Sequence, residues 1–472
     1  MPRVKQQEDL IAIFVHAGAG FHSEENEKAH LDIYYFQSCD LRHGFPSVRW
    51  ISRRCGRGSP HHPRRCPLTN AGYGSNLNEQ GNVECDASIV DHFGRSGAVG
   101  AVPNIRNPSV LARKIYDRAH LTDGISRIPP SLLVGEGATD FAWEQGIPVV
   151  PNDDLVSPHA HLRWKNWCQE LAEFEKSRAS NDNAWIRYPP VPLSTRLAHA
   201  VAAYDQGNFE ADSFQAGVLD PMQVETSKEL DGLVPNETST ECETLHFDTP
   251  GAQSLCDIDM PTQDTGYDAI SDTVGAIAID KYGNIAAGSS SGGIGMKHRG
   301  RVGPAALIGI GTHVMPIDPT DPEQTTVATV TSGTGEHIAS SLAAQTCAMR
   351  LYFGQRKGDA GKSEPVTEEE AMREMIIREF IGHPAVANSE YDGSLGILAV
   401  KKTVDGIGVY FAHNTDSFAL ASMCNGYDLK PQCLMSRSPA KGIVAQGGLM
   451  FRPFCFYNGT KRKMSNDTNE DE

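Results

Sequence analysis

The sequence lacks three features that would place the protein in a common class. It contains no apolar run of about eighteen residues, the length that a transmembrane helix needs. Its 11 cysteines are scattered singly without a Cys-x-x-Cys pair, which argues against a disulfide framework or a zinc site and indicates reduced thiols. Its net charge of −17 argues against general binding to nucleic acids or anionic membranes, because both would be repelled. We therefore expect a cytoplasmic or nuclear protein.

Length and composition indicate a globular protein with polar insertions. At 472 residues the chain exceeds what one hydrophobic core usually holds, so length alone suggests two or three domains. Residues 205–270 are acidic and have little apolar clustering, which is typical of a flexible linker. Residues 31–67 are basic and broken by proline and glycine, a composition that can indicate nucleic-acid contact but here lacks a fold to present it.

Hydrophobic patterns predict several elements around the later motifs. We expect a core strand, not a signal peptide, at 10–16, ending in the glycine turn 17–20. We expect two hairpins, and a helix that starts at Pro108 with Asn107 as its N-cap. The hairpin strands are 273–280 with 285–291, and 394–402 with 407–415.

A second helix is expected after residue 366. Thr367 and Glu370 have the spacing of a capping box, in which each side chain satisfies a backbone donor near the helix start. The helical period then predicts one buried face, formed by Ala371, Met375, Ile376 and Phe380.

Four short stretches after residue 270 carry residues suited to catalysis: DTVGAIAID (272–280), GSSSGG (288–293), GRVG (300–303) and TSGTGE (331–336). Each alone has an ordinary structural explanation. An N-terminal threonine, however, can act as nucleophile and base together, because its own α-amine accepts the hydroxyl proton. Such an amine titrates at about pH 7.7–8.0, close to neutrality. Cleavage between Asp272 and Thr273, at the end of a long flexible segment, would free that amine.

The other three stretches offer partners for this threonine. The predicted hairpin would bring Ser291 beside Thr273, where its hydroxyl could orient the nucleophile. Arg301 offers a bidentate fork for a carboxylate. Ser332 and Gly333 could supply a hydroxyl and a backbone N–H for an oxyanion hole. Together the four stretches predict one hydrolytic site.

In order and spacing, TVG, SSSGG, GRVG and SGTGE resemble the asparaginase-type family of N-terminal nucleophile (Ntn) hydrolases, whose members cut themselves before a threonine. The resemblance covers about 14–20, 68–151 and 272–453. It implies an α+β fold, a four-layer α-β-β-α sandwich built from both halves of the cut chain. It also implies roles for individual residues: Thr273 as nucleophile, Ser291 as its assistant, Ser332 and Gly333 as oxyanion hole, and Arg301 as carboxylate ligand.

Residue 304 separates the branches of that family. Asparaginases, isoaspartyl peptidases and glycosylasparaginases usually carry an Asp three residues after the motif arginine, where it pairs with the substrate's free ammonium. Here the position is Pro304, which has neither a charge nor an N–H. A free amino acid would leave its ammonium unpaired in a dry site, whereas an amine in a peptide bond needs no partner. The sequence therefore favours an endopeptidase that cuts after Asp.

A further branch of the family is threonine aspartase (taspase). The stretches VHAGAGFHSEENEK and SSSGGIGMKHRGRVG of this chain resemble it. That branch cleaves nuclear regulatory proteins after Asp and needs no metal or cofactor. The resemblance implies Lys28 near the active site, with a surface charge as the alternative. It implies partners as well: protein substrates with internal Asp sites, and an α/β heterodimer that pairs into a dimer of heterodimers, with no direct nucleic-acid or membrane contact. The expected parts are an α-subunit part at 1–204, a linker at 205–272, a β-subunit part at 273–460 and a polar tail at 461–472.

Residues 31–67 depart from the family, which has two amphipathic helices in their place. A wrongly spliced segment or a true insertion would explain the departure, and a chain without these helices could fail to cleave itself. Three hypotheses therefore stay open. The chain is an endopeptidase that cuts after Asp; an amidohydrolase acting on asparagine, isoaspartyl dipeptides or glycosylated asparagine; or a catalytically inactive binding protein of the same fold.

Overall fold

The computed structural model describes residues 10–24, 27, 69–119, 128–179, 273–425, 431–440 and 442–452. Contacts divide the chain into two units, Met1–Ala172 with Tyr267–Glu472, and Glu173–Gly266. Every element below belongs to the first unit, except the last turns of helix α5 (Pro158–Ala179). The atypical segment 31–67, the expected linker 205–272 and the polar tail 461–472 lie outside the described residues.

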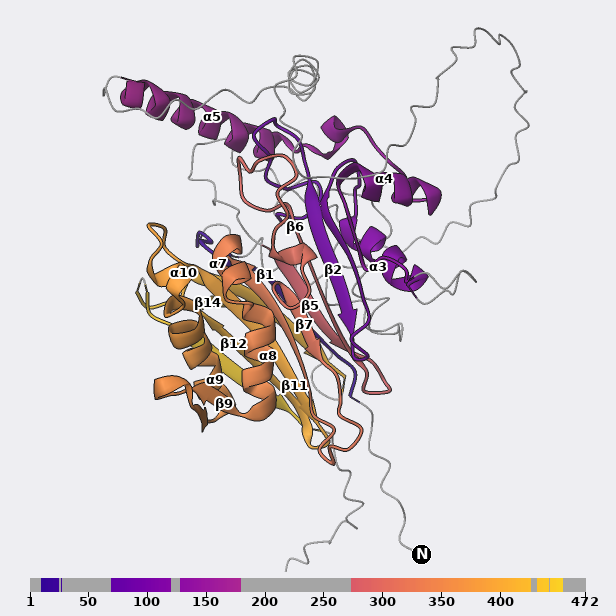
Figure 1. Cartoon of the computed structure of the whole chain (residues 1–472), viewed down its shortest axis with the longest axis vertical. Coiled ribbons are helices and arrows are strands. Elements are labelled where there is room, and N and C mark those ends of the chain that lie inside the picture. The colour runs from indigo at the N-terminus through magenta and orange to yellow at the C-terminus, as the bar shows by residue number, and fades with distance from the viewer. Residues whose placement is uncertain are drawn as a thin grey trace, which may run out of the picture. The chain divides into compact units, whose positions relative to one another are not determined.

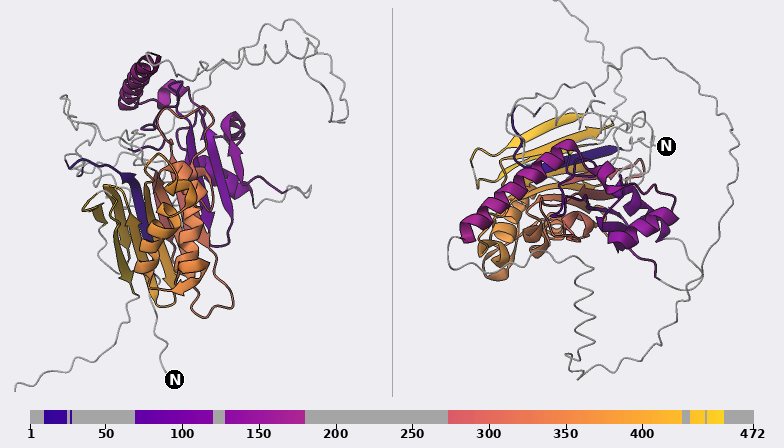
Figure 2. Two further views of the ribbon diagram at one scale, coloured as in Figure 1. Left: turned by 60° about the vertical axis from the view of Figure 1, so that its left-hand side comes forward. Right: turned by 90° about the horizontal axis from the view of Figure 1, so that it is seen from above.

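The described residues form two main sheets and a small two-stranded one, and the larger of the main sheets has eight strands (Figure 1). Neighbouring strands pair antiparallel, except the parallel last pair. In spatial order they are β14 (Gln432–Arg437), β13 (Ser417–Cys424), β1 (Ala12–Gly20), β5 (Val274–Ile279), β6 (Ile285–Ser291), β2 (Cys85–Asp91), β3 (Ser96–Val102) and β4 (Leu132–Val134). Strand β1, indigo in Figure 2, therefore lies between two strands from the second half of the chain.

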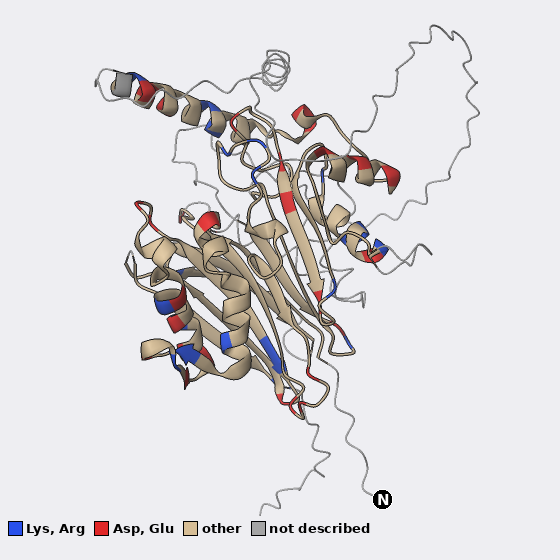
Figure 3. Cartoon of the chain, in the orientation of Figure 1, with Lys and Arg blue, Asp and Glu red and all other residues tan. Residues whose placement is uncertain are grey.

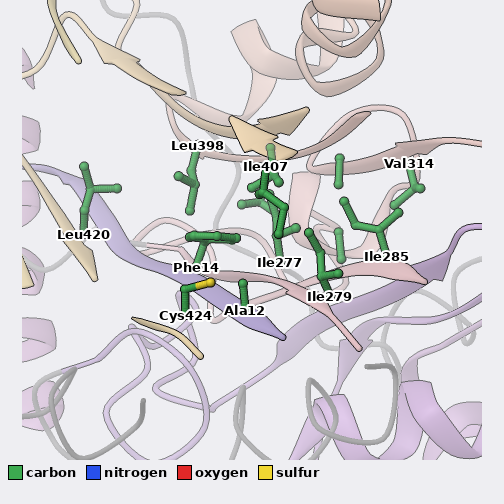
Figure 4. Close-up of a cluster of buried hydrophobic side chains, with 14 of the residues drawn as sticks. Ala12, Phe14, Ile277, Ile279, Ile285, Val314, Leu398, Ile407, Leu420 and Cys424 are labelled. Atoms are coloured by element: carbon green, nitrogen blue, oxygen red, sulfur yellow. The ribbon is translucent and has the colours of Figure 1, made fainter. Parts of the chain in front are cut away.

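The smaller sheet has five antiparallel strands, and an apolar core joins it to the larger one. Phe14 and Ile277 enter this core from the larger sheet, and Leu398 and Ile407 enter it from the smaller one (Figure 4). Burial of such side chains is the main favourable contribution to folding. The five strands, in spatial order, are β15 (Ala445–Phe451), β12 (Gly406–His413), β11 (Leu395–Thr403), β8 (Thr326–Gly333) and β7 (Thr312–Met315).

Helices pack against the other face of each sheet. Against β2 and β3 lie α3 (Pro108–Arg118) and α4 (Gly135–Glu144), in a cluster that includes Leu111 and Val99. Against the smaller sheet lie α8 (Ala343–Phe353), α9 (Glu368–Glu374) and the π-helix η5 (Met375–Ile381), in a cluster with Ile397. The prediction of an α+β fold is thus confirmed, with two large sheets at its centre.

Shorter elements complete the described chain, and charge is concentrated away from the strands. Most strand residues are uncharged, whereas α4, α5 and α9 carry many charged side chains (Figure 3). No helix within the described ranges is long and apolar enough to cross a membrane. The shorter elements are η2 (Asn152–Leu155), η3 (Pro304–Ala306), α7 (Gly335–Ser340), β9 (Gln355–Lys357), η4 (Asp359–Gly361), β10 (Ser363–Pro365) and α10 (Pro384–Ala387).

Most predicted elements near the site are present. Strands β5 and β6 form the first expected hairpin, and β11 and β12 form the second. The Thr367 hydroxyl accepts a hydrogen bond from the backbone N–H of Glu370, which is one half of the expected capping box, whereas the Glu370 carboxylate accepts from Nη1 of Arg356. The second half of that helix is a π-helix instead of an α-helix. Its predicted face is nevertheless buried, at Ala371, Met375, Ile376 and Phe380.

The predicted end of the first strand was wrong, and one predicted cap lacks its side-chain bond. The first strand does not end at residue 16, because β1 continues to Gly20 with a shift of register between His16 and Ala19. Gly18, at φ +131°, absorbs this irregularity in a conformation that favours glycine. Asn107 is the N-cap of the helix that begins at Pro108, as expected, although its side chain makes no capping hydrogen bond.

Candidate active site

Thr273 lies at the junction of three segments that are far apart in sequence. It immediately precedes β5, a central strand of the larger sheet, and only 9% of its surface is exposed. Its backbone nitrogen donates a hydrogen bond to the Ser332 Oγ at 3.3 Å. The same Oγ accepts a hydrogen bond from the backbone N–H of Ala19 at 3.1 Å. Strands β1, β5 and β8 therefore meet at the predicted nucleophile.

Ser291 lies on the strand next to Thr273. Val274 pairs with Ser290, so the same register continued by one residue places Ser291 opposite Thr273. Ser291 is buried, and its Oγ accepts a hydrogen bond from the Gly293 N–H at 3.0 Å. The hairpin thus brings Ser291 to the strand position opposite Thr273, while the Ser291 hydroxyl bonds to the following turn.

Ser332 and Gly333 end strand β8. Gly333 has φ +139°, and a Cβ at this position would lie 2.1 Å from the Ser394 carbonyl oxygen, so only glycine fits. The Ser332 hydroxyl contacts the backbone nitrogen of Thr273. That nitrogen becomes an α-amine if the preceding bond is cut. The structure thus brings the Ser332 hydroxyl within hydrogen-bond distance of the backbone nitrogen of Thr273, with Gly333 next to it in the chain.

Arg301 lies in a niche formed by glycines, and its guanidinium is already paired. Its side chain is 15% exposed, and its Nε and Nη2 lie 2.9 and 2.8 Å from the same Glu336 Oε1. A Cβ on Gly335 would lie 2.4 Å from Nη2, and one on Gly293 would lie 2.9 Å from Nη1. These glycines are needed because the guanidinium occupies the space that their side chains would take. The site therefore holds a fixed planar cation.

Two buried charges support the loop that carries Arg301. The Asp86 Oδ2 accepts a hydrogen bond from the Gly303 N–H at 2.7 Å, while the Lys297 Nζ donates to the Glu84 carbonyl oxygen at 2.7 Å. Burial raises the pKa of Asp86, and the positive charges of Lys297 and Arg301 act in the opposite direction. These contacts fix the position of the GRVG stretch relative to β2.

A buried histidine faces the strand that follows the nucleophile. His16 pairs with Gly275 across β1 and β5, and its Nε2 lies 2.2 Å from where a Gly275 Cβ would be. The His16 side chain is buried, with 1% of its surface exposed, and lies beside the backbone of Thr273. Burial lowers the pKa of His16 to about 3, against a smaller opposite effect from the backbone of Thr273. The ring is therefore neutral at physiological pH.

Some predicted residues cannot be placed, and others were not predicted. Lys28 and Asp272 lie outside the described residues. Sequence reasoning assigned no role to Glu336, although it ends the TSGTGE stretch, nor to Asp86 or His16. Its position shortly after the proposed oxyanion residues could have indicated a role for Glu336. Its partner Arg301, however, lies 35 residues earlier, and only the folded loops bring the two together.

The turn that begins at Asn70 supports the glycines next to Ser291. The Asn70 Nδ2 donates a hydrogen bond to the Gly293 carbonyl oxygen at 2.8 Å, and its backbone oxygen accepts one from the Gly292 N–H at 2.7 Å. This turn therefore holds the glycines that follow Ser291.

Within the ranges that the structure describes, no group of three or more His, Cys, Asp or Glu side chains could hold a metal ion.

Two facing sheets with a threonine at the start of a central strand are features of an N-terminal nucleophile hydrolase. The sequence model of the family described as Asparaginase matches residues 63–192 and 193–407, more than half of the chain. The protein therefore belongs to the asparaginase family of these hydrolases.

Individual relatives give the same family. An isoaspartyl peptidase/L-asparaginase from Xenopus laevis is 28% identical over 356 residues, which are 74% of this chain and 78% of the relative. An isoaspartyl peptidase from Salmonella typhimurium is 28% identical over 290 residues, 61% of each chain. An isoaspartyl peptidase/L-asparaginase from Danio rerio is 44% identical over a shorter match of 103 residues, 21% of this chain and 29% of the relative.

Proposed function

We propose that the chain cuts itself between Asp272 and Thr273 and then hydrolyses an amide bond that lies close to a substrate carboxylate. The observation that carries this proposal is the position of Thr273. Its backbone nitrogen lies 3.3 Å from a buried hydroxyl, that of Ser332, at the meeting point of three strands. A newly formed α-amine at this nitrogen would be held in place beside its own side-chain hydroxyl.

The chemistry follows from these groups. The Thr273 hydroxyl would attack the amide carbon while its proton passes to the α-amine. Backbone N–H groups near Gly333 would bind the oxyanion, and the protonated amine would then give its proton to the leaving nitrogen. Water would hydrolyse the resulting ester, releasing a carboxylic acid and restoring Thr273. Ser291 would keep the neighbouring turn in shape, and Arg301 would bind the substrate carboxylate.

The named relatives support a small amide as the substrate. They are isoaspartyl peptidases and L-asparaginases, so we propose hydrolysis of L-asparagine or of β-aspartyl dipeptides as the activity that the comparisons favour. In these substrates the scissile amide carbon and a carboxylate are separated by two carbons. Arg301 would bind that carboxylate and so place the amide at Thr273.

One observation favours a second substrate class, a peptide bond after Asp as in the taspase branch. Pro304 begins η3 three residues after Arg301 and offers no charge to a substrate ammonium. Glu336 is paired with Arg301, and both carboxylate oxygens of Asp86 accept backbone hydrogen bonds, from Ala101 and Gly303. A substrate whose amine is already in a peptide bond needs no such partner. Its Asp side chain has the same two-carbon spacing.

The architecture supports the finer expectation of a four-layer α-β-β-α sandwich. Residues 1–204 and 273–460 would form the α- and β-subunits of a heterodimer, because β1 and β2 from the first segment pair with β5 and β6 from the second. The extensive pairing would keep the two halves together after cleavage. Pairing of two such heterodimers remains part of the proposal, as does the Lys28 contribution.

The test compares the wild-type chain with Thr273→Ala on three substrates: L-asparagine, a β-aspartyl dipeptide and a peptide with one internal Asp. We expect turnover by the wild type and none by the variant. Ammonia release from L-asparagine or dipeptide cleavage supports the amidohydrolase, and cleavage of the internal-Asp peptide alone supports the endopeptidase. A folded wild-type chain that turns over none of the three contradicts both and leaves the inactive binding protein.

A further inference from the structure

We propose that Glu336 is a positioning residue, which holds the Arg301 guanidinium in the orientation that receives the substrate carboxylate. The inference deepens the proposed function and rests on it. Arg301 binds Glu336 through Nε and Nη2, both directed to the same Oε1, at 2.9 and 2.8 Å. One edge of the guanidinium is therefore occupied by a carboxylate of the chain itself.

Burial distinguishes the two partners of this pair. The Arg301 side chain is 15% exposed, whereas that of Glu336 is 59% exposed. The arginine therefore belongs to the interior of the site, and Glu336 holds it from the solvent side. An ion pair with one buried partner is screened less than a surface pair, so it can restrict the rotamers of the arginine.

The free side of the guanidinium faces the turn next to Ser291. A Cβ on Gly293 would lie 2.9 Å from Nη1 of Arg301, and one on Gly303 would lie 2.6 Å from it. The Gly293 N–H donates to the Ser291 Oγ. Glu336 contacts Nε and Nη2, whereas Nη1 lies beside Gly293, in the turn that follows Ser291, and beside Gly303, which the Asp86 carboxylate also approaches. The pair thus selects which edge meets a substrate.

Glu336 lies close in sequence to the proposed oxyanion residues. It follows Gly333 by three residues, in the first turn of α7, and Gly335 lies directly against the guanidinium. The segment 332–336 therefore contains both the proposed oxyanion residues and the glutamate that holds Arg301. Such a link fixes the distance between the site of attack and the carboxylate, a form of preorganisation.

The opposite role, in which Glu336 competes with the substrate for Arg301, makes an opposite prediction. A competitor would weaken binding of carboxylates, so its removal would lower Kd and KM. A positioning residue would strengthen binding, so its removal would raise both. The sign of the change therefore separates the two roles.

The experiment measures binding of N-acetyl-L-aspartate and of L-aspartate by titration calorimetry, together with kcat and KM for any substrate turned over. We expect Glu336→Ala to raise Kd for both ligands about fivefold, the scale of one partly exposed ion pair. We expect a smaller increase for Glu336→Gln, whose amide oxygen still accepts a hydrogen bond. KM should rise with Kd while kcat changes little, and the thermal midpoint should stay near that of the wild type.

Glu136→Gln is the matched control. Glu136 pairs at 2.7 Å with Arg299, two residues before Arg301, and both side chains are largely exposed. Its loss removes an ion pair from the same loop without touching the Arg301 guanidinium, so we expect unchanged Kd and KM.

Three results would overturn the inference. The first is unchanged or tighter ligand binding by Glu336→Ala. The second is weaker binding of L-aspartate alone, which would make Glu336 a ligand of the ammonium group. The third is that the folded wild type does not bind N-acetyl-L-aspartate. A wild-type chain that binds both ligands in the expected pattern, yet neither cleaves itself nor turns over a substrate, would refute the proposed function alone.

Discussion

The backbone nitrogen of Thr273 donates a hydrogen bond over 3.3 Å to the Oγ of Ser332, and so connects the larger sheet to the smaller one. The same Oγ accepts a second hydrogen bond from Ala19. An α-amine formed at residue 273 would take the place of this backbone nitrogen. The Ser332 hydroxyl is therefore suited to orient the base of the proposed reaction.

Loss of the Ser332 hydroxyl should slow turnover. We expect Ser332→Ala to lower kcat about 10- to 100-fold with a small change in KM, the range found when a general base or an oxyanion donor is disturbed. Steady-state kinetics would measure it. Ser341→Ala is the control, because Ser341 is also buried and hydrogen-bonded, to the His337 carbonyl oxygen, but lies in the following helical turn. Wild-type kcat in Ser332→Ala would contradict the role.

Gly275→Ala should destabilise the protein beside the nucleophile. The new Cβ would lie 2.2 Å from the His16 Nε2 and 2.9 Å from the Val330 Cβ, in an interior without space to give. We expect a loss of about 1–3 kcal/mol in unfolding free energy, as for other overpacked cores. Urea denaturation would measure it. Gly137→Ala serves as control, because nothing lies within 4 Å of its Cβ position; it should be neutral or slightly stabilising.

Arg301→Lys should weaken substrate binding although it keeps the charge. A lysine ammonium is a single point charge, so it cannot pair with Glu336 on one side and at the same time present a fixed planar edge to the substrate carboxylate. We expect KM to rise about tenfold, which corresponds to about 1.4 kcal/mol. Arg299→Lys, on the same loop but half-exposed, should leave KM unchanged. Equal KM values for wild type and Arg301→Lys would argue against Arg301 as the carboxylate ligand.

The buried histidines should make the protein less stable in acid. Burial lowers the pKa of His16 to about 3 and that of His413 to about 4, from 6.5, against smaller opposite effects of backbone hydrogen bonds. Between these values the unfolded chain binds more protons than the folded chain, so the unfolding free energy decreases as pH falls through this window. Above about pH 6.5 this contribution to stability is fully present, because both rings are neutral in both states.

The histidine effect can be measured by urea denaturation between pH 7 and pH 4.5. Each histidine should contribute a slope of up to about 1.4 kcal/mol per pH unit below about pH 6. His16→Gln should remove one of the two contributions and reduce the slope accordingly. If the variant and the wild type lose stability in parallel, the pKa of His16 in the folded protein is not lowered below that in the unfolded chain.

Much of the fold could be predicted because its signals are local. Short apolar runs bounded by turns indicated β5, β6, β11 and β12. The Thr367 cap and a predicted buried face indicated the helix that follows. The continuation of β1 to Gly20 could not be predicted, because glycines usually end a strand. Here pairing with β13 continues beyond the irregularity and overrides that local preference.

The site was predictable only where its residues lie in short motifs. The backbone nitrogen of Thr273 contacts the Ser332 hydroxyl, and the register of β5 and β6 continues to Ser291 opposite Thr273. The partners of these residues are set by tertiary contacts that no local pattern contains. Glu336 reaches Arg301 across 35 positions, and His16 reaches Gly275 from the other end of the chain.

Intact-mass spectrometry of the purified wild-type chain tests the central claim most directly. The chain should give two fragments in equal amounts, the second beginning at Thr273, while Thr273→Ala should give one uncut chain. Circular dichroism would establish that both proteins are folded. A folded wild-type chain with a single uncut mass, or one cut only at another bond, would contradict the assignment of Thr273 as the N-terminal nucleophile.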